Sequence, residues 1–265
     1  YETDGIHLNN TPCHFTFITP DDDLPPADLL LVAVKQHHLE RAIEQMRPFV
    51  SDETTILSLL NGISSEEILA EAFPDANVLH GFCVGTDAVR IGNRTTCSSI
   101  GRIVFGEKDN PVPSEAVIDI SQLFEQADIP TVVPDDICRE QWWKFMMNVG
   151  INQVSALSGA TYGDFCLRPE ALELAILASR EVVALAPREG VELSEEDIER
   201  YVSILHTLAP EGKTSMLQDI EAGRQTEVDI FSGTVVSLGK RHGVPTPVND
   251  VLYRLIRLKQ GAPAL

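Results

Sequence analysis

Lys144, Asn148 and Asn152 are the residues whose types and spacing are best suited to chemistry. They stand four residues apart in an otherwise mostly apolar stretch from Gln141 to Gln153. At 3.6 residues per turn, this spacing predicts one ammonium and two carboxamides on one stripe of a helix. Buried groups of this kind need hydrogen-bond partners, which a small anionic or carbonyl ligand would provide. The alternative is that Lys144 extends to solvent and the asparagines pair within the protein.

The elements before this helix predict a sheet with a ligand-binding edge. Residues 28–34 and 54–60 form apolar runs of strand length, typical of parallel strands buried on both faces, and Lys35 and Asn61 follow them directly. Helices to about residue 49 and at 65–73 alternate with these strands and with a third strand at 77–84. This alternation predicts a doubly wound parallel sheet, in which ligands gather at the carboxyl edge. Alternatively, Lys35 is an exposed loop residue and Asn61-Gly62 a simple turn.

The remaining segments divide the chain into two domains. Antiparallel strands within 85–106, a helix at 114–126 and a strand at 131–133 complete the first domain, residues 1–134. Residues 135–265 predict helices alone, with a cap at Asp136, a capping box at Ser194 and helix ends at Gly190 and Gly243. The expected helices are 137–157, 169–189, 195 onward, 215–222, 227–242 and 248–259. The fold class is therefore an α/β domain with a parallel sheet, followed by an all-helical domain.

Composition restricts the classes of partner. The 265 residues carry a net charge of −20, which argues against nucleic acid, and only six lysines, so that Lys35 and Lys144 stand out. No apolar run is long enough to span a membrane. Five scattered cysteines without paired spacing indicate reduced thiols and a cytoplasmic protein. His37, His38 and His80 show no metal-ligand spacing with carboxylates or cysteines, so no metal is expected. Exposed apolar helix faces in the second domain would permit a homodimer.

Five segments together resemble the ketopantoate reductase (2-dehydropantoate 2-reductase) family. They match its motifs in order and spacing across nearly the whole chain, and they read LLLVAVK (29–35), LLNG (59–62), WKFMMNVGIN (143–152), SMLQDI (215–220) and TEVD (226–229). The resemblance implies a Rossmann domain that binds NADP as NADPH, followed by a helical domain. It also implies reduction of 2-dehydropantoate to pantoate in the synthesis of pantothenate, the precursor of coenzyme A.

The resemblance also implies roles for individual residues. Lys144 would be the general acid, which hydrogen-bonds the ketone oxygen and gives up a proton as hydride arrives at the carbon. The substrate-binding residues would be Asn61, Asn148, Asn152 and Ser215, and the cofactor-binding residues would be Lys35, Asn61 and Glu227. From the residues alone, Ser215 is better explained as a helix cap, and Glu227 at a helix start could serve only as a charge that favours the helix dipole.

Two departures from the family pattern leave alternatives open. The expected glycine-rich turn after the first strand is absent, so either a segment of roughly 35 to 50 residues is expected before Tyr1, judged from the size of a βαβ unit, or the chain is a truncated relative. Tyr162 stands where some members carry another substrate-contacting asparagine. The alternatives are a reductase of another branched 2-oxo acid, and a non-catalytic nucleotide-binding sensor that lacks the glycine-rich loop.

Overall fold

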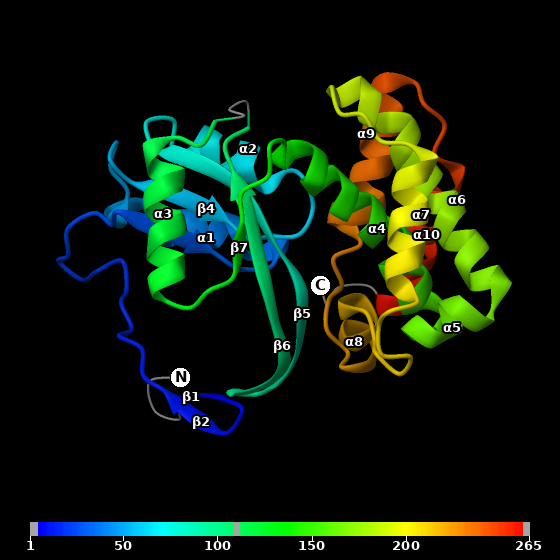
Figure 1. Cartoon of the computed structure of the whole chain (residues 1–265), viewed down its shortest axis with the longest axis horizontal. Helices are drawn as coiled ribbons and strands as arrows, with labels where there is room; N and C mark the ends of the chain where they lie inside the picture. Colours follow the sequence, from blue (N-terminus) through cyan, green and yellow to red (C-terminus); the bar gives the residue numbers. More distant parts are fainter. Residues whose placement is uncertain (1–4, 109–111, 262–265) are drawn as a thin grey trace. The chain divides into compact units, whose positions relative to one another are not determined.

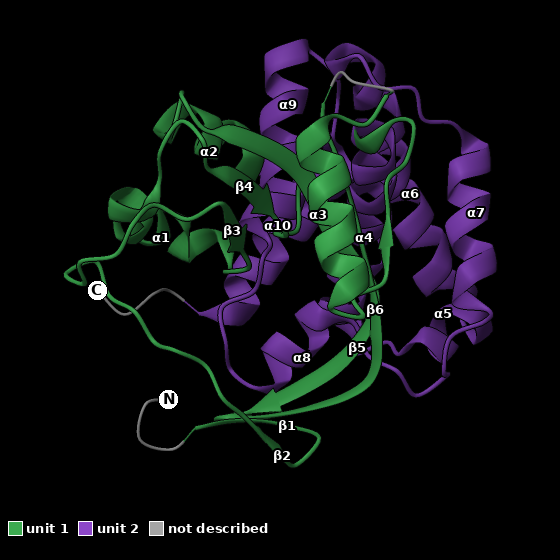
Figure 2. Ribbon diagram, turned by 60° about the vertical axis from the view of Figure 1, so that its left-hand side comes forward, with its two compact units in different colours: residues 1–137 green, residues 138–265 purple. Residues whose placement is uncertain are grey.

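The computed structural model describes residues 5–108 and 112–261, which form two compact units. Unit 1 is Tyr1–Ile137 and unit 2 is Cys138–Leu265, and each is described by itself (Figures 1 and 2). The Asp-Gly pair at residues 4 and 5 is typical of a turn, and its aspartate lies outside the described residues. No helix among the described residues is both long enough and apolar enough to cross a membrane.

Unit 1 is a mixed sheet with helices on both faces. Its strand order is β2-β1-β6-β5-β4-β3, with β7 beside β6; β3, β4 and β5 run parallel, whereas β5 and β6 are antiparallel. The α/β fold class is confirmed. The elements are β1 Ile6–Leu8, β2 Thr11–Cys13, β3 Leu29–Val32, η1 Gln36–His38, α1 Leu39–Met46, η2 Arg47–Phe49, β4 Thr55–Ser58, α2 Ser65–Ala72, β5 Asn77–Ile91, β6 Arg94–Gly106, α3 Glu115–Gln126 and β7 Thr131–Val132.

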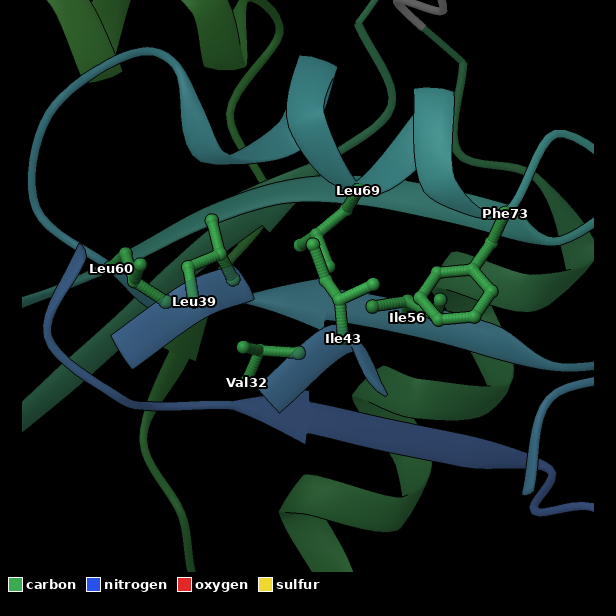
Figure 3. Close-up of a cluster of buried hydrophobic side chains, with 7 residues drawn as sticks. All are labelled: Val32, Leu39, Ile43, Ile56, Leu60, Leu69 and Phe73. Carbon is green, nitrogen blue, oxygen red and sulfur yellow. The ribbon is translucent and has the colours of Figure 1, made fainter. Parts of the chain in front are cut away.

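Alternating side chains of the strands build a core on each face of this sheet. On β4, Ile56 packs with the helices α1 and α2, and the next residue, Leu57, packs with α3 on the opposite face. Figure 3 shows the first of these cores, in which Leu39 and Ile43 of α1 meet Leu69 of α2 over the strands. Both faces of β4 are therefore fully buried, as its apolar run predicts.

The prediction that both faces of the first strand are buried is wrong for β3. Val32 is buried, but Leu31 is 47% exposed. The physical reason is position, because β3 lies at one end of the strand order and pairs with β4 alone among the described strands. The apolar run therefore predicted the strand correctly, but it predicted the burial of one of the strand's two faces incorrectly.

Unit 2 is built from helices, and its described residues contain no strand, as predicted. Its elements are α4 Ile137–Ser158, which begins at the last residue of unit 1, α5 Tyr162–Leu167, α6 Pro169–Leu185, η3 Ala186–Glu189, α7 Glu195–Leu205, α8 Ser215–Glu221, η4 Asp229–Gly233, α9 Thr234–His242 and α10 Pro247–Gln260. The caps at Gly190, Ser194 and Gly243 are confirmed. The short helix α5 was not predicted, and the first part of the expected helix 227–242 is instead η4, a π-helical turn that α9 follows directly.

Close packing of α4 on α6 explains the glycine in the middle of α4. A Cβ atom on Gly150 would lie 2.5 Å from Ser179 Oγ and 2.9 Å from the backbone oxygen of Ala175. Ser179 Oγ also lies 3.3 Å from the oxygen of Met146 and 3.2 Å from the hydroxyl of Tyr201 on α7. Burial raises the pKa of the Tyr201 phenol, so this junction holds it neutral. Gly150 lies between Asn148 and Asn152, so this packing fixes the backbone of α4 between two residues of the polar stripe.

Candidate active site

The polar stripe predicted on the long helix is present on α4. Lys144, Asn148 and Asn152 are 8%, 7% and 5% exposed, so all three are buried. They lie in a 22-residue helix that also carries fully buried apolar residues such as Met146 and Val149. Their polar atoms are therefore largely removed from solvent and must find hydrogen-bond partners in the protein or in a ligand.

The two asparagines form a directed chain of hydrogen bonds with Ser215. Ser215 Oγ donates to Asn152 Oδ1 at 3.4 Å, and Asn152 Nδ2 donates to Asn148 Oδ1 at 3.0 Å. The alternative in which the asparagines pair within the protein is therefore correct as far as their oxygens are concerned. Because each amide accepts through its oxygen and donates through its nitrogen, the chain ends at Asn148 Nδ2, a donor. A donor end of this kind suits a carboxylate or hydroxyl ligand.

Ser215 is not the cap of its helix. Thr214 occupies the N-cap position of α8, and its hydroxyl accepts a hydrogen bond from the amide of Leu217 at 3.3 Å. Ser215 is the first helical residue, and its hydroxyl points to Asn152 instead. The interpretation of Ser215 as a simple cap is therefore wrong, and its side chain belongs to the polar chain on α4.

Helix α7 holds the N-terminal part of α4. The guanidinium of Arg200 lies 4.0 Å from the centre of the Trp143 ring, and Trp143 Nε1 donates to the oxygen of Asp197 at 3.1 Å. The Asp197 carboxylate also accepts from Arg139 at 2.8 Å. Because Trp143 immediately precedes Lys144, these contacts restrict the backbone on which the lysine is carried.

Glu227 precedes the π-helical turn η4 in unit 2. The residue is 8% exposed, and its backbone oxygen accepts from the amides of Ile230 and Phe231 at 3.1 and 3.3 Å. The preceding residue is also fixed, because the amide of Thr226 donates to Gln260 Oε1 at 3.0 Å. The segment that carries the Glu227 carboxylate is therefore rigidly attached to η4 and α10.

Lys35 and Asn61 belong to unit 1 and follow the carboxyl ends of neighbouring parallel strands. Val32 at the end of β3 is in register with Ser58 at the end of β4, and Lys35 and Asn61 each lie three residues beyond. Both are partly buried. Gly62 has a φ of +93°, a conformation that favours glycine, so the chain can turn sharply behind Asn61. The predicted positions at this edge of the sheet are confirmed, and the predicted roles stay predictions.

A buried polar cluster of Ser58, Ser65 and Glu66, on either side of Asn61 in the sequence, was not predicted. Ser58 Oγ and Ser65 Oγ are 2.8 Å apart, and Ser65 Oγ donates to Glu66 Oε2 at 2.9 Å. The amide of Leu60 lies 3.4 Å from Ser58 Oγ. These residues connect the end of β4 with the start of α2 and therefore brace the loop that carries Asn61. The only sequence signal for them is a serine at the end of a strand.

No group of three or more histidine, cysteine, aspartate or glutamate side chains suited to a metal ion occurs among the residues that the structure describes. On α4, the Glu140 carboxylate pairs with Arg200 at 3.2 Å and lies 3.8 Å from Arg139. Glu140 therefore belongs to the ion pairs where α4 meets α7.

Models of known protein families match most of both units. The family model "Ketopantoate reductase PanE/ApbA" matches residues 2–110, and "Ketopantoate reductase PanE/ApbA C terminal" matches residues 136–260. The chain belongs to the ketopantoate reductase family. The second match contains the whole polar stripe of α4, together with Ser215 and Glu227, and the first contains Lys35 and Asn61.

Individual members of the ketopantoate reductase family are distant relatives. The 2-dehydropantoate 2-reductase of Streptococcus pyogenes serotype M3 is 27% identical over 242 residues, which are 91% of this chain and 78% of the relative. A crystal structure of 2-dehydropantoate 2-reductase from Methylococcus capsulatus is similar with a TM-score of 0.80 and 28% identity, over 91% of this chain and 76% of that one. A complex of D-mandelate dehydrogenase with NADH has a TM-score of 0.86 at 22% identity, over 96% and 84% of the chains, which indicates a shared fold.

Proposed function

We propose that the protein is an oxidoreductase that reduces 2-dehydropantoate to pantoate with NADPH, a step of pantothenate synthesis. The observation that carries this proposal is the buried Lys144 on the same helix stripe as the Ser215–Asn152–Asn148 chain. A protonated lysine and an amide donor end suit a ligand that has both a ketone oxygen and a carboxylate. Membership of the ketopantoate reductase family supports the substrate.

In the proposed reaction, Lys144 acts on the ketone oxygen. Its ammonium donates a hydrogen bond that stabilises the negative charge developing on this oxygen, and then gives up a proton to form the product hydroxyl. Asn148 and Asn152, one and two turns further along α4, orient the carboxylate and hydroxyl ends of the substrate, with Ser215 fixing the chain. NADPH supplies the hydride that the carbonyl carbon accepts.

The residues at the carboxyl edge of unit 1 fit a nicotinamide dinucleotide. Lys35 offers a cation to its phosphates, and Asn61 offers an amide beside a sharp turn at Gly62, at the edge where doubly wound sheets bind such cofactors. In this proposal Asn61 contacts both the substrate and the cofactor, and Glu227 contacts the cofactor. D-mandelate dehydrogenase, a protein of similar fold, has been solved as a complex with NADH, which is a nicotinamide dinucleotide.

The test is turnover of the purified protein, measured by the loss of NADPH absorbance in the presence of 2-dehydropantoate. Lys144→Met should lower kcat by roughly 10²- to 10⁴-fold, the contribution typical of a general acid, with an unchanged circular dichroism spectrum. Lys240→Met is the matched control, because Lys240 is exposed on α9, and its kcat should equal that of the wild type. Full activity of a folded Lys144→Met variant would refute the role of Lys144.

Two further measurements separate the alternatives. The ratio of kcat/KM for NADPH and NADH decides the cofactor, and a panel of branched 2-oxo acids decides the substrate. A higher kcat/KM with another 2-oxo acid would favour a related reductase. Tight dinucleotide binding without turnover on any member of the panel would favour the non-catalytic sensor.

A further inference from the structure

The π-helical turn η4 begins two residues after Glu227. One of its backbone hydrogen bonds spans five residues, whereas those of a regular α-helix span four. In an α-helix, the amide of Ser232 would donate to the backbone oxygen of Val228, four residues earlier. Here the Val228 oxygen accepts from the amide of Gly233 at 3.0 Å, five residues later. The turn therefore contains one extra residue, which is the defining feature of a π-bulge.

The amide that the π turn displaces is taken by a side chain of α4. Ser232 N donates to Gln153 Oε1 at 3.2 Å, and the Ser232 hydroxyl donates to the same oxygen. Gln153 and Ser232 are both fully buried. A buried amide without an acceptor would cost free energy, so the Gln153 oxygen is what makes the extra residue tolerable.

Gln153 is itself held firmly in place. Its Nε2 donates to the oxygen of Val149 at 2.7 Å and to Asn249 Oδ1 at 3.2 Å. Asn249 Nδ2 in turn donates to Glu181 Oε2 at 2.7 Å, and the carboxylate of Glu181 accepts the amides of Val248 and Asn249 at the start of α10. Three helices of unit 2, α4, α6 and α10 (Figure 1), therefore fix the position of the oxygen that meets Ser232.

We infer that Gln153 is a positioning residue, whose amide oxygen imposes the π turn of η4 and thereby sets the direction of the Glu227 carboxylate. Removal of one residue from a helical turn rotates the preceding chain by roughly 100° about the helix axis and shifts it by about 1.5 Å. Without Gln153, the turn would relax to an α-helix and Glu227 would face a different direction. The catalytic consequence rests on the proposed cofactor role of Glu227, whereas the structural one does not.

The first experiment tests the turn itself. Gln153→Met keeps the length of the side chain and removes the acceptor, so a crystal structure of this variant should show Ser232 N bonded to the Val228 oxygen in a regular α-helix. A folded variant that retains the π turn would overturn the inference. If Gln153→Met does not fold, Gln153→Asn, which withdraws the oxygen by one methylene length, should show the same relaxation and is judged by the same outcome.

The second experiment tests the consequence for Glu227. The dissociation constant for NADPH should rise in Gln153→Met on the order of tenfold, the effect of one charged hydrogen bond, and Glu227→Gln should add little further loss in that background. Ser155→Ala is the matched control, because Ser155 is another fully buried polar residue of α4 and its hydroxyl donates to the backbone oxygen of Ala160, away from η4. Its affinity should equal that of the wild type.

The outcomes of the two experiments are separable. A relaxed turn with unchanged affinity for NADPH would support Gln153 as the cause of the π turn and overturn the proposed consequence for cofactor binding through Glu227. If the wild type does not bind a nicotinamide dinucleotide at all, the proposed function fails, while the crystal structures still decide whether Gln153 imposes the π turn.

Discussion

Single residues of the site are oriented by the direction of their hydrogen bonds. The Asn148 amide can present either its nitrogen or its oxygen to a ligand, and these have opposite effects on a carboxylate. The donor Asn152 Nδ2, 3.0 Å from Asn148 Oδ1, fixes which of the two is presented. Asn152 therefore determines the chemistry that Asn148 offers, in addition to any contact of its own.

This orientation predicts the effect of Asn152→Ala. The variant removes the donor to Asn148 Oδ1, so the Asn148 amide can turn its oxygen toward the substrate carboxylate and repel it. We expect the KM for the 2-oxo acid to rise by roughly 10- to 100-fold, the range for a lost hydrogen bond to a charged group, with a smaller change in kcat. Steady-state kinetics at saturating NADPH measure both constants.

Ser215→Ala is the graded control for Asn152→Ala. It removes only the hydroxyl that donates to Asn152 at 3.4 Å, leaves the Asn152–Asn148 bond intact, and leaves the helix cap to Thr214. Its KM should therefore rise less than that of Asn152→Ala, and its thermal stability should be unchanged. Equal increases of KM in the two variants would contradict the argument from bond direction.

The polar stripe of α4 was predictable from the sequence because its spacing is local. Lys144, Asn148 and Asn152 stand out because a period of four residues is visible within one helix. Gln153 has no such signal, because its partners Ser232 and Asn249 are 79 and 96 residues away. Nothing in the local sequence distinguishes it from any other polar residue beside an apolar stripe.

Helices and strands were predictable where their ends carry local chemistry. Gly190 and Gly243 end helices because both adopt a positive φ, and Ser194 with Asp197 forms a capping box. The exposure of β3 was not predictable, because strand order is a long-range property of the sheet. The π turn was likewise hidden, because its cause is a side chain on a different helix.

The packing of α4 on α6 predicts the effect of Gly150→Ala. In an isolated helix this substitution would stabilise by about 1 kcal/mol. Here the new Cβ would lie 2.9 Å from the backbone oxygen of Ala175, which cannot move as a side chain can. We therefore expect a net loss of about 1–3 kcal/mol in the free energy of unfolding, as for overpacked cores. Urea denaturation at pH 7 measures it.

Gly233→Ala is the matched control for Gly150→Ala. Gly233 also has a helical backbone, but the atom nearest to its new Cβ is Tyr253 Cε2, a side-chain atom at 3.4 Å. This variant should lose less stability than Gly150→Ala. If Gly150→Ala is as stable as the wild type, the contact between α4 and α6 is looser than the structure indicates.

For the whole molecule, the boundary between the two units at Ile137 lies close to the change from strands to helices after Pro134. The homodimer stays a prediction, because exposed apolar residues on helices do not specify what covers them. Charge acts at this scale as well. With 40 acidic and 20 basic residues, the net charge of −20 repels anions at distances where no single side chain dominates.

This charge predicts an unusual response to salt. The proposed substrates are anions, and ionic screening reduces long-range repulsion over about 10 Å at 0.1 M salt, whereas contacts of a buried cation such as Lys144 are screened much less. We therefore expect kcat/KM to rise between about 10 and 150 mM NaCl, through KM rather than kcat. The dinucleotide, which carries several charges, should respond more steeply than the singly charged oxo acid, which serves as an internal control. A fall of kcat/KM over this range would mean that local cations such as Lys35, rather than the net charge, govern the approach of the substrates.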